Sequence, residues 1–410
     1  MPHLDNKAVA RQSMEHLHRL CVEIGPRPSG SPGNQAAAEY IQSVFQGCGL
    51  EVEMQEFACP AWEELSTSLE LNGNRLAAAA NAYSPPCNVA APLVPVGTVA
   101  ELEAARLDGC IGLLYGDLTK APLSPKSWFL KDEREDHILR LLEEKRPAAL
   151  ITIQSAPGDL PRLIEDWELP IPSATVPAQT GLALLQQPEA AVRLRIESRQ
   201  SAGSTCNVVA RKAGANPSKI VLCAHYDTKI DTPGAGDNAS GVAVLLSLAQ
   251  QLSQSSLACS LEWVAFTNEE YLPVGDDEYL RRGESQFGQI LAAINFDRVG
   301  LTLGANTFTT LAGSQSLQGQ VVELAKSYPG VVQVEPWPES NHSTFSWRGV
   351  PSLAFSSAGG APLDHRRADS SEWISPAKLA EVVSLVAEII DRLQDKPLAW
   401  ARQAQPEAAR

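Results

Sequence analysis

Six side chains that can bind a metal ion or move a proton follow apolar runs in the second half of the chain. They are His225, Asp237, Glu269, Glu270, Asp297 and His365. Imidazole and carboxylate groups act as ligands of divalent cations and as general bases. Carboxylates that meet without a counter-charge repel and raise one another's pKa, so a cluster of them calls for cations. If these side chains meet in the fold, the sequence predicts a catalytic metal centre.

The stretch 220–248 holds two of these residues in a strand, loop and helix pattern. It opens with the apolar run IVLCA, which is typical of a strand buried on both faces, and turns polar at His225. Asp237 and the short polar residues after it suit the start of a helix, and residues 241–250 carry the apolar side chains that a helix would bury. His225 and Asp237 therefore lie where a strand meets a helix, the usual place for chemistry in an α/β sheet.

The other candidates also follow strand-like runs. Glu269 and Glu270 come after LEWVAFTN, and Asp297 comes after AAINF. Parallel strands lie about 4.8 Å apart and their carboxyl ends open at one edge of the sheet, so these side chains can meet. A second imidazole could come from His365 in LDHRRAD or from His342 in ESNHSTFSW.

Two histidines with three carboxylates suit zinc, but five ligands are too few for two separate zinc sites. If Asp237 bridges, one ion obtains His225, Asp237 and Asp297. The other ion then obtains Asp237, Glu270 and His365. Positions for a water and a substrate remain open, as a catalytic site requires. The cofactor prediction is two Zn²⁺ per chain, and another divalent metal is compatible with the same ligands.

The motifs HYDT, PGAGDNASG, NEE, NFDRVG and DHRRAD together resemble peptidase family M28. This is a family of co-catalytic dizinc peptidases that includes aminopeptidases and glutamate-type carboxypeptidases. The earlier IGPRPSGSPGNQAAAEYI and GLEVEMQEF are similar to the start of that family. The resemblance covers residues 12–57 and 205–390, and the segment between them is similar to a protease-associated (PA) insert domain.

The resemblance implies a role for each matched residue. The implied metal ligands are His225, Asp237, Glu270, Asp297 and His365, with Asp369 following His365 much as an acidic residue follows the family's ligand. Glu269 is the implied general base, which activates a metal-bridging water. Asp227 is the implied carboxylate that orients His225, since a ligating histidine normally donates its second ring N–H to such a group.

The implied activity is that of an aminopeptidase, which hydrolyses the N-terminal peptide bond of peptides. A carboxypeptidase or dipeptidase that recognises a substrate carboxylate, and a catalytically silent binding protein on the same scaffold, are the alternatives. Arg366 and Arg367 stand where the family commonly has Thr-Pro, and one of them could clamp such a carboxylate.

Residues 234–239 also fit the dinucleotide-binding pattern GxGxxA, but a polar loop separates them from the strand and Asp237 would face the pyrophosphate.

Alternating strand-like and helical stretches predict an α/β fold: a mixed, mostly parallel sheet with helices on both faces, of the zinc exopeptidase, phosphorylase/hydrolase-like kind. The predicted domains are a discontinuous peptidase domain, 1–57 and 205–396, a smaller β-rich insert domain, 58–204, and a frayed tail, 397–410. The predicted strands are 50–57, 92–96, 110–115, 148–153, 174–177, 207–210, 220–224, 261–266, 292–296 and 352–355. The predicted helices are 6–22, 34–46, 131–145, 241–252, 317–326 and 376–393.

Length and composition limit the partners. A chain of 410 residues favours two domains, and 44% hydrophobic with 20% charged residues is typical of a soluble globular protein. The net charge of −15 argues against a nucleic-acid partner, and no apolar run approaches the roughly 18 residues of a membrane span. The N-terminus lacks the apolar core of a signal peptide, so we expect a cytoplasmic protein whose partner is a peptide substrate. The sequence allows a homo-oligomer. The histidines at 3, 16, 18 and 137 are expected to be solvated.

Overall fold

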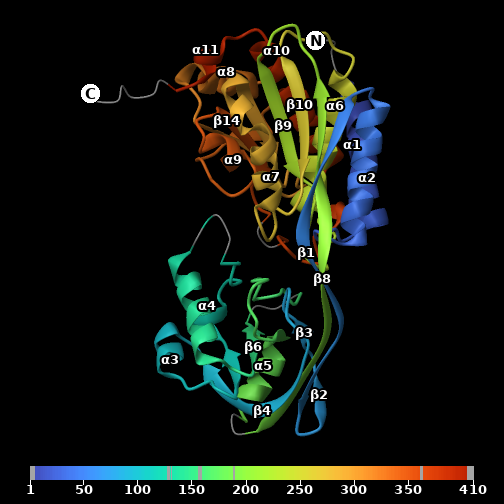
Figure 1. Cartoon of the computed structure of the whole chain (residues 1–410). Coiled ribbons are helices and arrows are strands. Elements are labelled where there is room, and N and C mark those ends of the chain that lie inside the picture. The colour runs from blue at the N-terminus through green and yellow to red at the C-terminus, as the bar shows by residue number, and fades with distance from the viewer. Residues whose placement is uncertain are drawn as a thin grey trace, which may run out of the picture. The chain divides into compact units, whose positions relative to one another are not determined.

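The computed structural model describes residues 5–126, 130, 132–155, 159–187, 190–360 and 363–403. The chain divides into two compact units (Figure 1): unit 1 is Met1–Phe57 with Ser204–Arg410, and unit 2 is Ala58–Gly203. Two long strands, β1 (Glu51–Leu71) and β8 (Ala191–Lys212), pair with each other and continue from one unit into the other. The expectations for His3, for Lys131 at the start of a predicted helix and for residues 404–410 of the tail lie outside the described residues.

Unit 1 is built on a mixed sheet with the strand order β13-β12-β14-β11-β9-β10-β8. The central strand β9 runs parallel to β10 on one side and to β11 on the other. β11 and β14 are also parallel, as are β12 and β13, whereas β8 with β10 and β12 with β14 are antiparallel. The strands are β9 (Lys219–His225), β10 (Ser260–Phe266), β11 (Ile290–Phe296), β12 (Asn306–Leu311), β13 (Val331–Gln333) and β14 (Ser352–Ser357).

Alternate residues of β9 enter two different apolar cores because successive side chains of a strand point to opposite faces. Ile220, Leu222 and Ala224 belong to the larger core, and Val221 and Cys223 belong to the smaller one. The larger core includes the buried faces of α1 (Asn6–His18), α2 (Pro32–Gly47), α6 (Gly241–Leu252), α8 (Gln315–Ala325) and α10 (Pro376–Leu393), and the smaller core includes residues of α7 (Val274–Gly283) and α9 (His342–Ser346). The central strand is therefore buried on both faces.

His16 is buried, although the sequence analysis expects a solvated side chain. It is only 4% exposed, and its Nδ1 lies 2.7 Å from the Tyr40 hydroxyl while its Nε2 lies 3.0 Å from Gln250 Oε1. The reason is that α1 packs against α6 through this side of the helix. The expectation of a solvated His16 is therefore wrong.

The beginning of the predicted tail is ordered. Residues Leu398–Ala401 form the short helix α11, and Ala401 is fully buried. Ser314 donates its backbone N–H to the Ala401 carbonyl at 2.8 Å and its hydroxyl to the Trp400 carbonyl. The tail was expected to be frayed from residue 397, so that part of the prediction is wrong.

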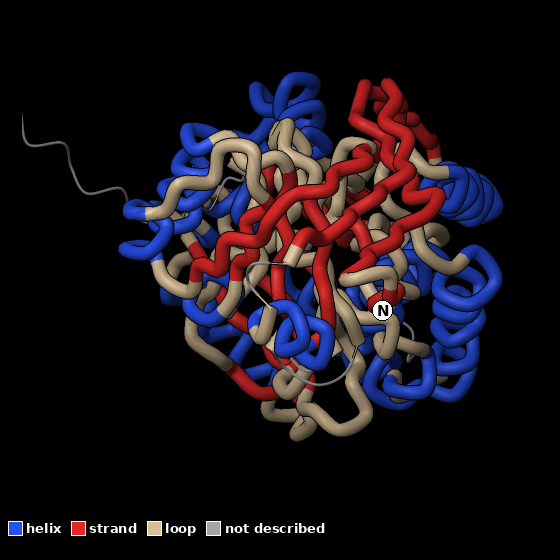
Figure 2. The backbone as a smooth tube through the Cα atoms, turned by 90° about the horizontal axis from the view of Figure 1, so that it is seen from below, coloured by secondary structure: helices blue, strands red, loops and turns tan. Residues whose placement is uncertain are grey.

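Unit 2 contains four parallel strands in the order β4-β5-β6-β7, with a helix between β4 and β5 and another between β5 and β6. Figure 2 shows the backbone of the chain with its strands and helices in different colours. The apolar side chains of unit 2 form two cores made of residues from this unit alone. It was predicted as β-rich, and it is itself an α/β unit. Its elements are β2 (Asn74–Leu76), β3 (Ala79–Ala80), β4 (Cys87–Val96), α3 (Val99–Ala104), β5 (Ile111–Leu114), α4 (Glu133–Lys145), β6 (Ala149–Gln154), β7 (Ser173–Pro177) and α5 (Ala178–Leu185).

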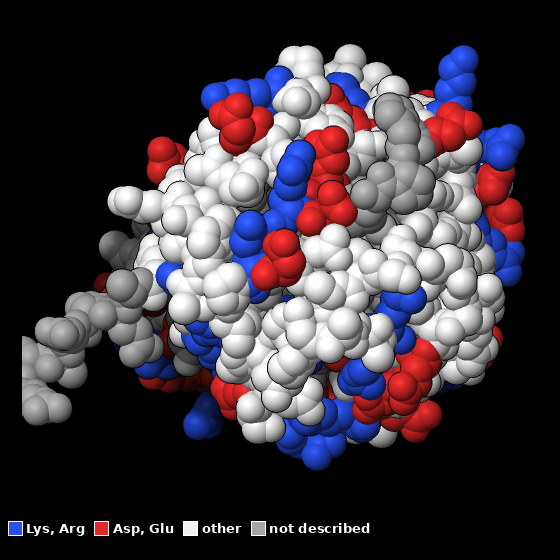
Figure 3. All heavy atoms as spheres, turned by 90° about the horizontal axis from the view of Figure 1, so that it is seen from above, with Lys and Arg blue, Asp and Glu red and all other residues white. Residues whose placement is uncertain are grey.

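The face of the molecule drawn in Figure 3 carries charges of both signs. In the space-filling view of Figure 3, lysine and arginine side chains lie beside aspartate and glutamate side chains. Exposed pairs such as Arg11 with Glu15 each contribute about 1 kcal/mol or less to stability.

Among the helices of the described ranges, none is both long enough and apolar enough to cross a membrane.

Candidate metal centre

Three neighbouring strands of unit 1 end at the same edge of the sheet. The last residues of β9, β10 and β11 are His225, Phe266 and Phe296, and the three strands run parallel. Because the carboxyl ends of parallel strands open on one side, the polar residues that follow them are brought together there.

The loop that connects His225 to Asp237 is held by Arg27, whose side chain is fully buried. Its guanidinium donates to the backbone carbonyl oxygens of Leu20, Gly25, Tyr226, Pro233 and Gly234 at 2.8 to 3.0 Å. Arg27 also donates its backbone N–H to the Thr228 hydroxyl at 2.9 Å. The N-terminal segment thus fixes the course of the chain between two candidate ligands.

Two glycines permit the tight turn before Asp237. Gly234 has the left-handed φ of 60°, and a Cβ there would lie 2.5 Å from the Asp237 carbonyl oxygen. Gly236 donates its N–H to Asp369 Oδ1 at 2.7 Å, and Asp237 donates its own to Asp369 Oδ2 at 3.0 Å. A Cβ at Gly236 would lie 3.0 Å from Asp369 Oδ1, so the close approach of Asp369 and the φ of Gly234 account for the two glycines of the dinucleotide-like pattern.

Asp227 joins the loop after β9 to the segment after β10. Its Oδ1 accepts the Glu269 backbone N–H and its Oδ2 accepts the Glu270 backbone N–H, both at 3.2 Å. Asp227 Oδ1 also lies 3.6 Å from His225 Nδ1, which is longer than an ordinary hydrogen bond. Asp227 was predicted to orient His225, and the structure gives it a second contact that the sequence did not indicate.

The two oxygens of Asp237 face two different histidines. Asp237 Oδ1 lies 3.2 Å from His225 Nε2, and Asp237 Oδ2 lies 3.2 Å from His365 Nε2. Glu270 Oε2 is 3.3 Å from His365 Nε2, whereas Asp297 Oδ1 is 3.6 Å from His225 Nε2. Asp237 thus stands between a His225–Asp297 group and a His365–Glu270 group.

Glu269 lies at the His225 side of this cluster. Its Oε2 is 3.9 Å from His225 Nε2, and its side chain is 13% exposed. The structure therefore brings together all six side chains that the sequence singled out. His365 is the most accessible of them, with 45% of its side chain exposed, whereas the His225 side chain is 1% exposed.

The crowded carboxylates control the protonation of the centre. Burial lowers the pKa of His225, but the carboxylates around it, Glu269 first, outweigh burial and raise the pKa well above its usual value. Burial raises the pKa of Asp237, yet His225 and His365 hold it well below its usual value. Burial raises the pKa of Glu269 far above its usual value, partly opposed by His225. The centre therefore holds positive charge strongly, as protons or as cations.

The donor set fits a metal centre. The atoms His225 Nδ1, His225 Nε2, Glu270 Oε1 and Asp297 Oδ1 are buried and have no hydrogen-bond partner within the described part of the chain. Buried polar atoms are almost always partnered, so such a group needs a reason. One ligand atom from each of His225, Asp237 and Glu270 lies within 4.8 Å of the others. Nitrogen and carboxylate oxygen donors of this kind suit zinc.

His342, the alternative imidazole, is not part of this cluster. It is fully buried, and its Nε2 lies 2.7 Å from the Trp337 carbonyl oxygen. Its Nδ1 faces the Asn295 side chain at 3.5 Å, and its ring meets the Trp337 ring edge-on at 4.5 Å between centroids. These contacts give His342 a packing role in the core.

Two basic residues near the centre were not predicted. Lys229 is buried, donates to the Glu270 carbonyl oxygen and lies 4.2 Å from the centroid of the Tyr271 ring. Arg298, directly after Asp297, forms an ion pair with Asp364. The position of a cation directly after the candidate ligand Asp297 is the signal that could have marked Arg298, whereas no adjacent ligand marks Lys229. Arg367, one of the arginines that the sequence did single out, is 71% exposed and lies 3.1 Å from Asp231.

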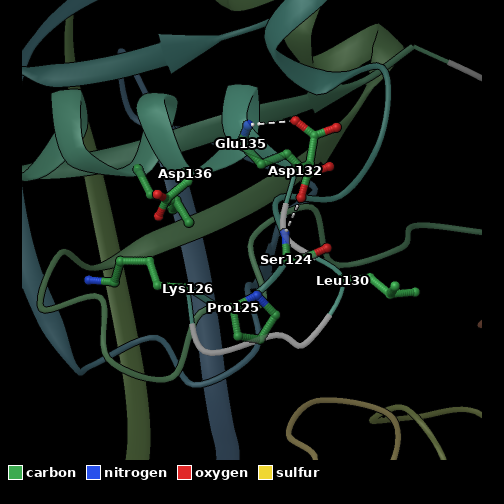
Figure 4. Close-up of a pocket in the computed structure, with 8 residues that line it drawn as sticks. Ser124, Pro125, Lys126, Leu130, Asp132, Glu135 and Asp136 are labelled. Atoms are coloured by element: carbon green, nitrogen blue, oxygen red, sulfur yellow. Dashed lines mark hydrogen bonds between the residues drawn. The ribbon is translucent and has the colours of Figure 1, made fainter. Parts of the chain in front are cut away.

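Unit 2 contains a small cavity at the start of α4 (Figure 4). Its volume is about 10 Å³, which is room for about one water molecule. Ser124 donates its backbone N–H to Glu135 Oε2 at 3.1 Å, and Asp132 caps the helix by accepting from the Glu135 N–H at 3.1 Å. The cavity is too small for a peptide.

A mixed, mostly parallel sheet with a buried histidine–carboxylate centre at its carboxyl edge has the arrangement of a metal-dependent α/β enzyme. Residues 207–390 match the model of peptidase family M28, which identifies this part of the chain as an M28 peptidase domain. The resemblance found in the sequence is thereby confirmed. The match does not extend into unit 2, so its interpretation as a PA domain stays a prediction.

Curated relatives carry aminopeptidase names. Aminopeptidase YwaD of Bacillus subtilis is 25% identical over 399 residues, which cover 93% of this chain and 84% of the relative. Probable lipoprotein aminopeptidase LpqL of Mycobacterium tuberculosis is 27% identical over 77% of this chain, and leucine aminopeptidase 2 of Trichophyton tonsurans is 23% identical over 74%. The matches span 63% and 61% of these two longer relatives.

Solved structures support the fold. BSAP, a zinc aminopeptidase from Bacillus subtilis, superimposes with a TM-score of 0.79 at 22% identity, covering 96% of this chain and 98% of that chain. An aminopeptidase from an Aneurinibacillus species gives a TM-score of 0.73 at 24% identity, covering 97% and 95%. The predicted α/β fold class is confirmed.

Proposed function

We propose that the protein is a dizinc aminopeptidase that removes N-terminal residues from peptides. The observation that carries the proposal is the position of Asp237, whose two carboxylate oxygens each lie 3.2 Å from a different histidine. A carboxylate that faces two imidazoles in this way suits a bridge between two ions. The names of the relatives, which include a zinc aminopeptidase, support the same activity.

We assign one metal position to His225, Asp237 and Asp297, and the other to Asp237, Glu270 and His365. The first group is supported by the separations of 3.2 and 3.6 Å between His225 Nε2 and the two aspartates. The second is supported by the separations of 3.2 and 3.3 Å from His365 Nε2 to Asp237 and Glu270. When bound, zinc ions polarise the substrate carbonyl and make a water molecule more acidic.

Glu269 is the proposed general base. Its carboxylate lies beside His225, with Oε2 3.9 Å from His225 Nε2, and a carboxylate placed next to the metal ligands can accept a proton from an attacking water. Glu269 takes the proton from the attacking water and later delivers it to the amine that leaves. Asp227 supports the same step indirectly, because it holds the backbone N–H of Glu269 at 3.2 Å.

The choice of the N-terminus rests on charge. An exopeptidase must hold one end of its substrate, and the carboxylates of this centre can receive a terminal ammonium group. The net charge of −15 also favours a cationic over an anionic end. The aminopeptidase names of the relatives agree with this choice.

A panel of short peptides tests the proposal. Each peptide is supplied free, acetylated at the N-terminus or amidated at the C-terminus, and cleavage is followed with the metal present, after chelation and after zinc is restored. We expect chelation to stop cleavage and added zinc to restore it. Acetylation of the N-terminus should abolish cleavage, whereas amidation of the C-terminus should not. The Glu269→Gln variant, purified in parallel, controls for contaminating peptidases.

Loss of cleavage on C-terminal amidation instead would point to a carboxypeptidase. Absence of any chelator-sensitive cleavage would leave a binding protein on the peptidase scaffold. We also propose a cytoplasmic location, which cell fractionation tests.

A further inference from the structure

We propose that Arg298 is a positioning residue that holds His365 in the metal centre through its ion pair with Asp364. The inference rests on the proposed function, because it assigns a role to a residue that supports a metal ligand. Arg298 immediately follows the candidate ligand Asp297, and Asp364 immediately precedes the candidate ligand His365. The ion pair therefore joins the segment that carries Asp297, a ligand of one metal position, to the segment that carries His365, a ligand of the other.

Arg298 also contacts the third ligand segment. Its backbone N–H donates to Asn238 Oδ1 at 3.3 Å, and Asn238 follows Asp237. The same Asn238 side chain donates to the Phe296 carbonyl oxygen at 2.8 Å and accepts the Gly241 N–H at 2.9 Å. Arg298 thus lies where the segments of Asp237, Asp297 and His365 meet.

His365 needs such support because it is carried by a loop. Its side chain is 45% exposed, and its φ of 58° is in the left-handed region that non-glycine residues seldom adopt. Asp369 anchors the later end of this loop by accepting the N–H groups of Gly236 and Asp237. The Arg298–Asp364 ion pair anchors the earlier end, so that His365 lies between two fixed points.

The sign of the effect separates positioning from charge. The guanidinium of Arg298 is a cation close enough to act on Asp237 and Asp297. By charge alone, its removal would strengthen the binding of metal cations at those carboxylates. If Arg298 instead positions His365, its removal weakens metal binding, because the ligand is released from its place.

The test measures zinc affinity by competition with a chelator, together with zinc content, for Arg298→Met, Asp364→Asn and the double variant. We expect at least one of the two zinc ions to bind roughly 10- to 100-fold more weakly in Arg298→Met, as for other residues that support a ligand. The double variant should be no worse than the more affected single variant, because both lose the same ion pair. The matched control is Arg348→Met, since Arg348 pairs with Glu284 at 2.6 Å and its side chain has the same 34% exposure as that of Arg298.

Unchanged or tighter binding of both zinc ions in Arg298→Met would overturn the inference. It would also be overturned if the loss of zinc affinity in the double variant equalled the sum of the losses in the two single variants. Higher KM for peptides with an acidic side chain, at unchanged zinc affinity, would also overturn it by assigning Arg298 to substrate binding. If Arg298→Met does not fold, Asp364→Asn carries the test, and wild-type zinc affinity there rejects the inference. Failure of the wild-type protein to bind zinc or cleave peptides would instead reject the proposed function.

Discussion

Asp237 Oδ2 lies 3.2 Å from His365 Nε2, and its other oxygen lies equally close to His225. A carboxylate shared in this way belongs to both metal positions. Asp237→Ala should therefore abolish binding of both zinc ions, whereas His365→Ala and Asp297→Ala should each remove one. Zinc content measured by elemental analysis after gel filtration distinguishes the three variants. Retention of one full equivalent of zinc in Asp237→Ala would reject the bridging role.

Glu269→Gln should separate metal binding from catalysis. The amide keeps the shape of the side chain but cannot accept the proton of the attacking water. We expect both zinc ions to remain bound while kcat falls by roughly 10²- to 10⁴-fold, the usual contribution of a general base. Steady-state kinetics and zinc content are measured on the same preparation. Near-normal turnover would show that another group accepts the proton.

Arg27→Met should destabilise unit 1 strongly. The guanidinium of Arg27 donates to five backbone carbonyl oxygens, four of them buried and that of Pro233 part-buried, and methionine offers no donor to replace it. Leaving such acceptors without partners should lower the free energy of unfolding by about 3 kcal/mol or more. Urea denaturation of the metal-free protein measures this effect without a contribution from zinc. Arg19→Met, at a side chain that is 46% exposed, is the control and should change stability by about 0.5 kcal/mol or less.

Asp276 should give the protein a measurable pH dependence of stability. Burial raises the pKa of Asp276 from 3.8 to about 6, although Thr344 and Asn341 donate hydrogen bonds to it. Folding therefore takes up a proton here between about pH 4 and pH 6. The contribution of this group to stability is largest below that range and falls as the pH rises through it.

The Asp276→Asn variant lacks this ionisation. The wild-type minus variant difference in the free energy of unfolding should decline by about 3 kcal/mol from pH 4 to pH 6 and then level off. Urea denaturation at a series of pH values measures the difference. Asp277→Asn, at the exposed neighbouring position in the same helix, serves as control. A difference that is flat across this range would contradict the expectation.

The sequence predicted long, regular elements best. The helices expected at 241–252 and 376–393 coincide with α6 and α10, because their apolar residues recur with a clear helical period. β13 was missed because its three residues are too few to show a period. α7 was missed because its sequence, VGDDEYLRRG, is mostly polar, and only Gly275, Asp276 and Tyr279 are buried.

The sequence could predict which side chains of the candidate centre meet, where their meeting follows from the order of the strands. His225, Glu270 and Asp297 meet because β9, β10 and β11 are parallel neighbours, a relationship that alternating strands and helices indicate. The contacts of Asp227 with two backbone N–H groups depend on the paths of the loops. No spacing in the sequence encodes such paths, and the same is true of the Arg298–Asp364 pair.

The passage of β1 and β8 through both units has a consequence for the order in which the protein can assemble during synthesis. Unit 2 is continuous in sequence, so its cores can form as soon as residue 203 has left the ribosome. The N-terminal helix α1 must wait much longer, because it packs against α6 in the middle of the chain and against α10 near its other end. We therefore expect the inserted unit to fold first and the peptidase unit to close around its own N-terminus only when translation is nearly complete.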